Sequence, residues 1–201
     1  TLDLVLAMIE KKEEKNGRVY MSLEKIKPTD YMRTVQDYPQ PGVNFYDINS
    51  LFAQPAWNHC AAALSVEIQR LFNRNGDLSH IVGIESRGFV VGAVIASCIG
   101  VPFVMVRKKG AKYPGSLLEE TYALEYGEDT LVIQEGILGY TNRVLIADDL
   151  VATGGSALAT KRLVEQTGAT VVGFTSVINL AYLNTEEMKR QMLITLEEIT
   201  K

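Results

Sequence analysis

Between Arg143 and Ala157 the sequence reads Arg-Val-Leu-Ile-Ala-Asp-Asp-Leu-Val-Ala-Thr-Gly-Gly-Ser-Ala. Its first five residues form an apolar run typical of a buried strand, which ends in Asp148 and Asp149. A glycine-rich turn follows and leads into a helix predicted over 156–167. Because ligands of α/β sheets bind beyond the carboxyl ends of the strands, this turn is the first place to look for a site.

The sequence on either side of this stretch predicts more strands and helices in alternation. Apolar runs predict strands at His80 to Ile84, Phe103 to Val106 and Thr170 to Ile178. Helical spacing predicts helices from Pro55 to Gly76 and over 89–99. The predicted fold class is therefore α/β, with a mostly parallel twisted sheet and helices on both faces.

The turn after the two aspartates has the chemistry of a phosphate site. Backbone N–H groups of Thr153 to Ser156, at the positive end of the next helix, can surround a phosphate, and the glycines let the backbone approach it. Two adjacent carboxylates, Asp148 and Asp149, suit the paired hydroxyls of a ribose. An isolated Asp-Asp or Gly-Gly would more simply cap or close a turn. The whole string together favours the functional interpretation.

Composition limits the other possibilities. With 201 residues, 47% of them hydrophobic and 22% charged, the chain has the size of one domain with a full core. A net charge of −4 argues against a nucleic-acid surface, which depends on clustered Lys and Arg. The two cysteines, Cys60 and Cys98, lie in apolar stretches and are expected to be core residues.

One uncharged stretch, Gly88 to Val106, superficially resembles a membrane span because Arg107, Lys108 and Lys109 follow it. Gly100-Val-Pro102 divides the stretch, so we expect a buried helix and then a short strand, and no membrane partner. The start of the chain is an amphipathic stripe unlike a signal or transit peptide. We expect a helical extension over 1–30, with a further helical stretch from about Leu23 to Val35, and a cytoplasmic protein.

The residues from Val144 to Ala157 resemble the phosphoribosyl pyrophosphate signature of the type I phosphoribosyltransferases. Three other segments resemble the adenine branch of that family: Asp37 to Ile48, Gly83 to Phe89, and the basic stretch that begins at Arg107 and ends at Gly127. The resemblance covers roughly Tyr31 to Leu180. It implies one domain over 31–201, with a small hood near 37–50 and a flexible loop near 107–127.

The resemblance also implies the ribose-phosphate and pyrophosphate contacts. It assigns substrate binding in the glycine-rich stretch to Asp148, Asp149, Leu150, Ala152, Thr153, Gly154, Gly155, Ser156 and Ala157. Glu85 and Ser86 would form the pyrophosphate turn with a cis peptide between them, and Arg87 would act catalytically on the pyrophosphate. Arg107, Lys108 and Lys112 would be loop contacts, although a basic run by itself is usually a solvated surface.

The base-binding residues are implied in the same way. Backbone groups near Val43 would recognise adenine, and the ring of Phe45 would stack on it. Tyr46 stands where the family commonly has arginine, and Ala111 looks like an extra residue before Lys112. In the loop, Glu125 would handle the purine proton as a catalytic residue and Tyr126 would contact substrate.

The implied activity is transfer of the phosphoribosyl group to adenine, which gives AMP and pyrophosphate. Mg²⁺ would be held by substrate and water with no dedicated protein ligands, and the protein would be a homodimer. One alternative keeps the fold and uses hypoxanthine, guanine or xanthine as the base. Another is a non-catalytic regulator that senses phosphoribosyl pyrophosphate; the residues before Tyr31 offer no basic recognition helix for that role.

Overall fold

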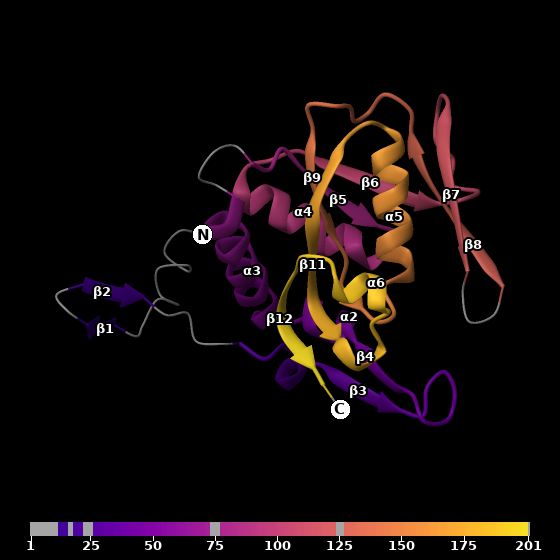
Figure 1. Cartoon of the computed structure of the whole chain (residues 1–201). Helices are drawn as coiled ribbons and strands as arrows, with labels where there is room; N and C mark the ends of the chain where they lie inside the picture. Colours follow the sequence, from indigo (N-terminus) through magenta and orange to yellow (C-terminus); the bar gives the residue numbers. More distant parts are fainter. Residues whose placement is uncertain (1–11, 16–17, 22–25, 73–76, 124–126, 201) are drawn as a thin grey trace. The chain divides into compact units, whose positions relative to one another are not determined.

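The structure is a computed structural model that describes residues 12–15, 18–21, 26–72, 77–123 and 127–200. The chain divides into two compact units, Thr1–Ala63 and Leu64–Lys201 (Figure 1). The dividing point falls within helix α3 (Ala56–Phe72), whose residues Leu64 and Ile68 are fully buried. Each unit is described separately.

The first unit is built from short elements. They are β1 (Lys12–Lys15), β2 (Arg18–Met21), the 3₁₀ helix η1 (Pro28–Tyr31), β3 (Arg33–Gln36), β4 (Asn44–Asp47), α2 (Ile48–Phe52) and the first part of α3. Strands β1 and β2 pair antiparallel, and so do β3 and β4.

Strands β1 and β2 lie within residues 1–30, and β3 begins before Val35, where helices were predicted. The turn between β3 and β4 explains why β3 is a strand and not part of a helix, because it folds the chain back on itself. Asp37 Oδ1 accepts the Gly42 N–H at 2.7 Å, and the Tyr38 N–H donates to the Val43 carbonyl at 3.2 Å. Once the turn closes, residue 35 lies opposite residue 45 in a strand ladder, which overrides any local helical preference.

The second unit holds the main sheet. Its strands are β5 (His80–Ile84), β6 (Phe103–Lys108), β7 (Leu117–Ala123), β8 (Glu128–Gln134), β9 (Arg143–Ala147), β10 (Leu150–Val151), β11 (Thr170–Leu180) and β12 (Leu193–Ile199). Within the described residues their order is β10-β11-β9-β5-β6-β8-β7, and β12 also pairs with β11. Pairs from β6 through β5 and β9 to β11 are parallel, whereas β8 and β7 are antiparallel.

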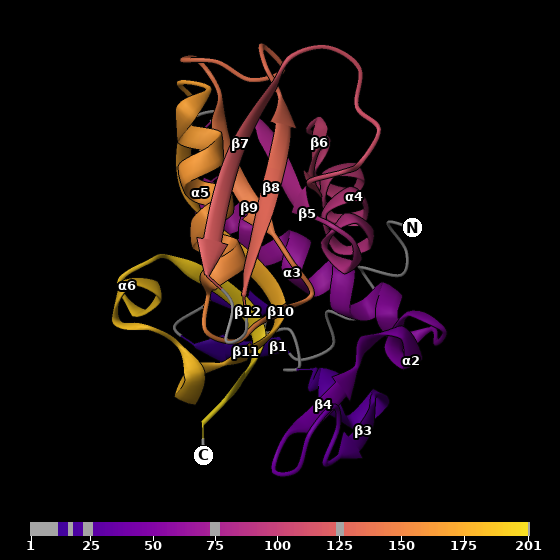
Figure 2. The same ribbon diagram turned by 90° about the vertical axis from the view of Figure 1, so that its right-hand side faces the viewer.

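Helices lie on both faces of the sheet. Helix α4 (Arg87–Ile99) lies on one face and α5 (Gly155–Gln166) on the other (Figure 2). Strands β5 and β9 are buried along almost their whole length, as expected for parallel strands covered on both sides. Val82, Ile146 and Phe174 are among the residues of the core that results. The predicted fold class, a mostly parallel sheet between helices, is confirmed.

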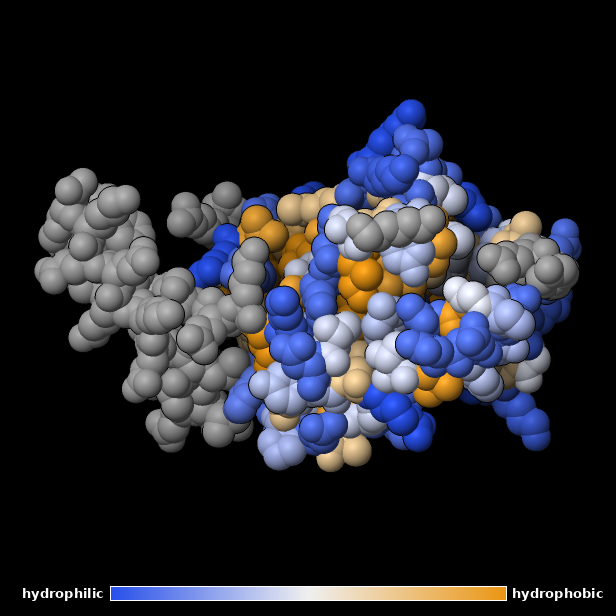
Figure 3. Space-filling model, turned by 90° about the horizontal axis from the view of Figure 1, so that it is seen from below, coloured by the Kyte–Doolittle hydropathy of each residue, from blue (hydrophilic) through white to orange (hydrophobic). Residues whose placement is uncertain are grey.

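The uncharged stretch from Gly88 to Val106 divides as the sequence predicts, but Cys98, which was expected to be a core residue, is exposed. Helix α4 ends at Gly100, whose φ is 76°, and β6 follows. None of the described helices has the length and apolar character needed to cross a bilayer. The face shown in Figure 3 carries hydrophilic residues with hydrophobic patches between them.

Strands β7 and β8 are not among the predicted strands. β7 falls within the segment near 107–127 for which the family resemblance implies a flexible loop. The two strands are joined by seven residue pairs, from Leu117 opposite Gln134 to Ala123 opposite Glu128. In β8 the apolar run Leu131 to Ile133 is fully buried or nearly so. That run was the available sequence signal for the strand.

Candidate active site

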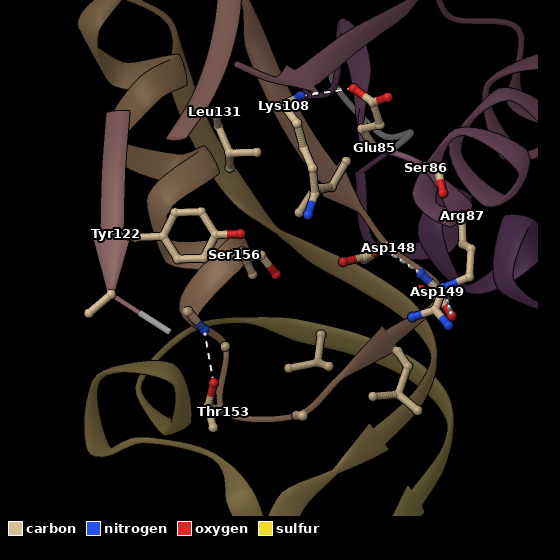
Figure 4. Close-up of a pocket in the computed structure, with 18 residues that line it drawn as sticks. Glu85, Ser86, Arg87, Lys108, Tyr122, Leu131, Asp148, Asp149, Thr153 and Ser156 are labelled. Atoms are coloured by element: carbon tan, nitrogen blue, oxygen red, sulfur yellow. Dashed lines mark hydrogen bonds and ion pairs between the residues drawn. The ribbon is translucent and has the colours of Figure 1, made fainter. Parts of the chain in front are cut away.

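A cavity of about 640 Å³ lies at the carboxyl ends of the parallel strands (Figure 4). Most residues predicted to bind the ribose phosphate and pyrophosphate line it: Glu85, Ser86, Arg87, Lys108, and every residue from Asp148 to Ala157 except Val151, which lines it without having been predicted. They come from β5, the start of α4, β6, and the connection between β9 and α5. The structure therefore brings together segments up to about 70 residues apart in the sequence, and the cavity has the size of a small-molecule site.

The aspartate pair lies at the end of β9. Asp149 is 2% exposed, and it forms an ion pair with Arg87, whose Nε lies 3.1 Å from Asp149 Oδ2. Burial raises the pKa of both carboxyl groups. The Asp149 carboxylate raises the pKa of Asp148 further, and Arg87 opposes the rise at Asp149. Asp148 Oδ1 accepts the Asp149 N–H at 2.9 Å, so the two side chains are held by different partners.

The turn from Ala152 to Ser156 leads into α5. Gly154, the residue before the helix, has a φ of 89°, which only glycine adopts easily. A Cβ at Gly154 would lie 2.6 Å from Met188 Cγ, so a larger residue would also displace that side chain. Thr153 Oγ1 accepts the Gly155 N–H at 3.3 Å (Figure 4). This backbone, at the positive end of α5, has the geometry of an anion cradle.

The second turn of the cavity connects β5 to α4. The Glu85–Ser86 peptide is cis, as the family resemblance implied. Gly88 lets the start of α4 approach β9, because a Cβ there would lie 2.8 Å from the Ala147 carbonyl oxygen and 3.0 Å from Asp148 Oδ1. This close approach places Arg87 beside the aspartates, where its half-exposed guanidinium also reaches the cavity.

The basic residues of β6 are held by carboxylates. Glu85 Oε2 accepts the Lys108 N–H at 2.8 Å and lies 3.3 Å from Arg107 Nε. Lys108 Nζ lies 2.8 Å from Asp129 Oδ2, and this contact is the main reason that the pKa of Asp129 is lowered. Both cations are therefore paired, and an anionic substrate in the cavity would compete for them.

Tyr122 of β7 also lines the cavity and was not predicted as a site residue. Burial and the neighbouring Asp129 raise the pKa of Tyr122 to about 12, and its hydroxyl donates to Asp129 Oδ2 at 3.4 Å. Ile84, Ala123 and Leu131 are further lining residues that were not predicted. The alternation of β7, which turns Tyr122 inward, was the available signal for the tyrosine.

Other predicted residues are not among those that line the cavity. Arg107 pairs with Glu85, and Lys112 lies exposed in the segment between β6 and β7. Val43, Phe45 and Tyr46 belong to the first unit, where the Phe45 ring packs edge-on against Tyr38 at a centroid distance of 5.2 Å. Glu125 and Tyr126 lie outside the described residues. The roles of all these residues stay predictions.

Comparisons with known proteins agree with this geometry. The family model "Phosphoribosyl transferase domain" matches residues 47–199, inside the domain predicted over 31–201. A relative from Gloeobacter violaceus, adenine phosphoribosyltransferase, is 45% identical over 157 residues, which cover 77% of this chain and 88% of the relative. The chain belongs to the adenine phosphoribosyltransferase family. Members of this family are enzymes of the pentosyltransferase class.

Solved phosphoribosyltransferases have the same fold. The crystal structure of adenine phosphoribosyltransferase from Rhodothermus marinus is 39% identical, with a TM-score of 0.72, and the match covers 85% of this chain and 95% of that one. The enzyme from Saccharomyces cerevisiae, complexed with an imino-altritol bisphosphate and adenine, is 34% identical with a TM-score of 0.75. That match covers 83% of this chain and 94% of the yeast chain.

Proposed function

We propose that this phosphoribosyltransferase transfers the 5-phosphoribosyl group of phosphoribosyl pyrophosphate to adenine, which gives AMP and pyrophosphate. The supporting observation is that one cavity joins an anion cradle, a buried aspartate pair and a second turn bearing Arg87. Phosphoribosyl pyrophosphate needs these three groups in this order, because it carries a phosphate, a ribose diol and a pyrophosphate.

At the ribose end, the turn from Thr153 to Ser156 binds the 5′-phosphate through its backbone N–H groups. Asp148 and Asp149 accept hydrogen bonds from the 2′- and 3′-hydroxyls. Displacement of pyrophosphate from C1 passes through a transition state with oxocarbenium character. Carboxylates close to the ribose stabilise the positive charge that develops there.

At the leaving-group end, Arg87 and Lys108 contact the pyrophosphate. Their present partners, Asp149 and Asp129, keep them within the cavity. Arg107 and Lys112 join them when the segment after β6 closes over the substrate. These cations stabilise the charge that accumulates on the departing pyrophosphate.

Magnesium accompanies the pyrophosphate in the proposed reaction. Within the described residues no group of three or more His, Cys, Asp or Glu side chains is arranged to hold a metal. The carboxylate oxygens of Asp148 and Asp149 are nevertheless hard donors of the kind that Mg²⁺ accepts directly or through water. This donor set suits an ion that arrives with the substrate and takes most of its ligands from substrate oxygens and water. There the ion would neutralise the charge of the pyrophosphate.

At the base end, backbone groups near Val43 and Tyr46 recognise the purine, and the Phe45 ring stacks on it. Glu125 accepts the proton that adenine loses from its imidazole ring, and Tyr126 contacts the substrate. Adenine is favoured over the 6-oxopurines because the relatives carry the name adenine phosphoribosyltransferase and the yeast structure contains adenine. Tyr46, where the family commonly has arginine, is the feature that leaves hypoxanthine, guanine or xanthine as the alternative.

Base competition tests the choice of substrate. We expect kcat/KM for adenine to exceed that for hypoxanthine and guanine by roughly 10⁴ or more, because a site that hydrogen-bonds one exocyclic group leaves buried groups unpaired with the wrong base. The measurement is initial rates with each base at fixed phosphoribosyl pyrophosphate and Mg²⁺. Comparable values for hypoxanthine would favour the 6-oxopurine alternative.

We also propose that the enzyme acts in the cytoplasm, and that it is a homodimer, as the family resemblance implies. Light scattering coupled to size-exclusion chromatography measures the mass in solution directly. A mass of one chain, at the concentrations used for assay, would contradict the dimer.

A further inference from the structure

The outer side of the phosphate turn is held by a segment that lies outside the cavity. This segment, residues 179–188, comprises the end of β11, the 3₁₀ helix η2 (Ala181–Leu183) and the first residues of α6 (Glu186–Lys189). It follows the turn by about 30 residues in the sequence. Neither Asn184 nor Thr185 is among the residues that line the cavity.

Three hydrogen bonds and one packing contact join the segment to the turn. Asn184 Nδ2 donates to the Ala152 carbonyl oxygen at 2.5 Å. The Thr185 N–H and Oγ1 donate to the Thr153 carbonyl oxygen at 3.1 and 3.2 Å. Met188, which is 2% exposed, packs so closely that a Cβ at Gly154 would meet its side chain.

Asn184 is itself fixed by its surroundings. The same Nδ2 lies 3.0 Å from Asn179 Oδ1 and 3.5 Å from the Leu180 carbonyl oxygen. Asn179 is 3% exposed, and its own amide nitrogen reaches Glu198 Oε2 of β12 at 3.5 Å. The amide of Asn184 is therefore oriented by the sheet before it contacts the turn.

These contacts determine where the N–H groups of the turn point. In a trans peptide the carbonyl and the next N–H point in opposite directions. Because the Ala152 and Thr153 carbonyls are held from outside the cavity, the N–H groups of Thr153 and Gly154 face the other side, toward the cavity that both residues line. Backbone N–H groups with this orientation are what binds a phosphate.

We infer that Asn184, assisted by Thr185, is a positioning residue for 5′-phosphate binding: it holds the two carbonyls so that the N–H groups of the turn are oriented before the phosphate arrives. The inference rests on the proposed function in one respect: it assumes that the bound phosphate belongs to a phosphoribosyl compound. Asn184 does not touch substrate. Its effect is confined to the phosphate end of the site, which separates this role from a general contribution to folding.

The test compares Asn184→Ala and Asn184→Asp with Asn142→Ala as a matched control. Asn142 Oδ1 accepts the Gly139 N–H at 2.8 Å, in a turn at the opposite end of β9. Calorimetric titration with ribose 5-phosphate measures the phosphate end, and steady-state kinetics give KM for phosphoribosyl pyrophosphate and for adenine. Thermal unfolding of each variant measures its stability.

For Asn184→Ala we expect the Kd for ribose 5-phosphate and the KM for phosphoribosyl pyrophosphate to rise roughly 3- to 10-fold, the worth of one ordinary hydrogen bond. The KM for adenine stays unchanged. Asn184→Asp has a larger effect, because a carboxylate oxygen faces the Ala152 carbonyl and Asn179 Oδ1 in place of a donor. Asn142→Ala leaves both substrate constants unchanged.

An unchanged Kd in Asn184→Ala, or an equal rise in both KM values, would overturn the inference. If that variant does not fold, Thr185→Val removes the hydroxyl contact to Thr153, together with the bond that the same hydroxyl accepts from the Met188 N–H at the start of α6. The same pattern is expected at the lower end of the range. Failure of the parent to bind ribose 5-phosphate would also overturn the inference. A parent that binds ribose 5-phosphate but makes no AMP would contradict the proposed function alone.

Discussion

At the scale of single residues, Asp148 combines a proposed binding role with a cost in stability. Its folded-state pKa is raised, first by burial and then by Asp149. Between its unfolded pKa, about 3.9, and that raised value, the folded protein binds a proton that the unfolded chain has released. Stability therefore falls as pH rises through this window, and the penalty persists above it.

Asp148→Asn is therefore expected to raise Tm at pH 7.5, with a gain that shrinks toward zero as the pH is lowered to about 4. The amide oxygen still accepts the Asp149 N–H, but the charge-assisted contact with the ribose is lost, so kcat/KM for phosphoribosyl pyrophosphate falls roughly 10- to 100-fold. Thermal unfolding over a pH series measures the first effect, with the exposed Asp30→Asn as control. A lower Tm at pH 7.5 would contradict the assignment.

Glu125 is the other residue with an individual prediction. Loss of a general base typically costs about 10²–10⁴ in rate, so Glu125→Gln should lower kcat by that factor while the binding of phosphoribosyl pyrophosphate stays nearly intact. Single-turnover kinetics with adenine measure the chemical step. Turnover close to the parent rate would assign the proton to water or to another group.

At the scale of elements, the connection between β9 and α5 depends on Gly154. Gly154→Ala places a Cβ at a φ of 89° and against Met188, so we expect a stability loss of about 1 kcal/mol or more. We also expect weaker binding of ribose 5-phosphate, because the turn must shift. Gly139→Ala is the control, since no atom lies within 4 Å of its added Cβ. Equal effects of the two substitutions would show that the turn tolerates a side chain.

The sequence predicted the elements whose signal is local. The apolar run 143–147, the aspartates and the glycine turn are consecutive. The sequence therefore predicts both their conformation and their position at the carboxyl end of a strand. Strands β7 and β8 were missed because they exist through pairing with each other, as Leu118 pairs with Ile133. β3 was predicted as helix from local residue spacing. Its strand conformation depends on contacts across the hairpin, which local spacing does not reveal.

The site shows the same limit. Arg87 and Asp148 were predicted from sequence, because the motif around each one has a family resemblance. Tyr122 was missed, since only the orientation of β7 turns it into the cavity. Asn184 was missed because it acts on a carbonyl 32 residues away, and no local pattern records such a contact.

At the scale of the whole molecule, the central claim is that the cavity in the second unit serves one reaction of adenine. Its most direct test is to incubate the purified chain with adenine, phosphoribosyl pyrophosphate and Mg²⁺, and to measure AMP and pyrophosphate. The same assay is run on the double variant Asp148→Asn, Asp149→Asn. The account predicts AMP and pyrophosphate in equal amounts from the parent and a rate reduced by roughly 10²-fold or more in the double variant. No AMP from the parent, or the same rate from both proteins, would contradict it.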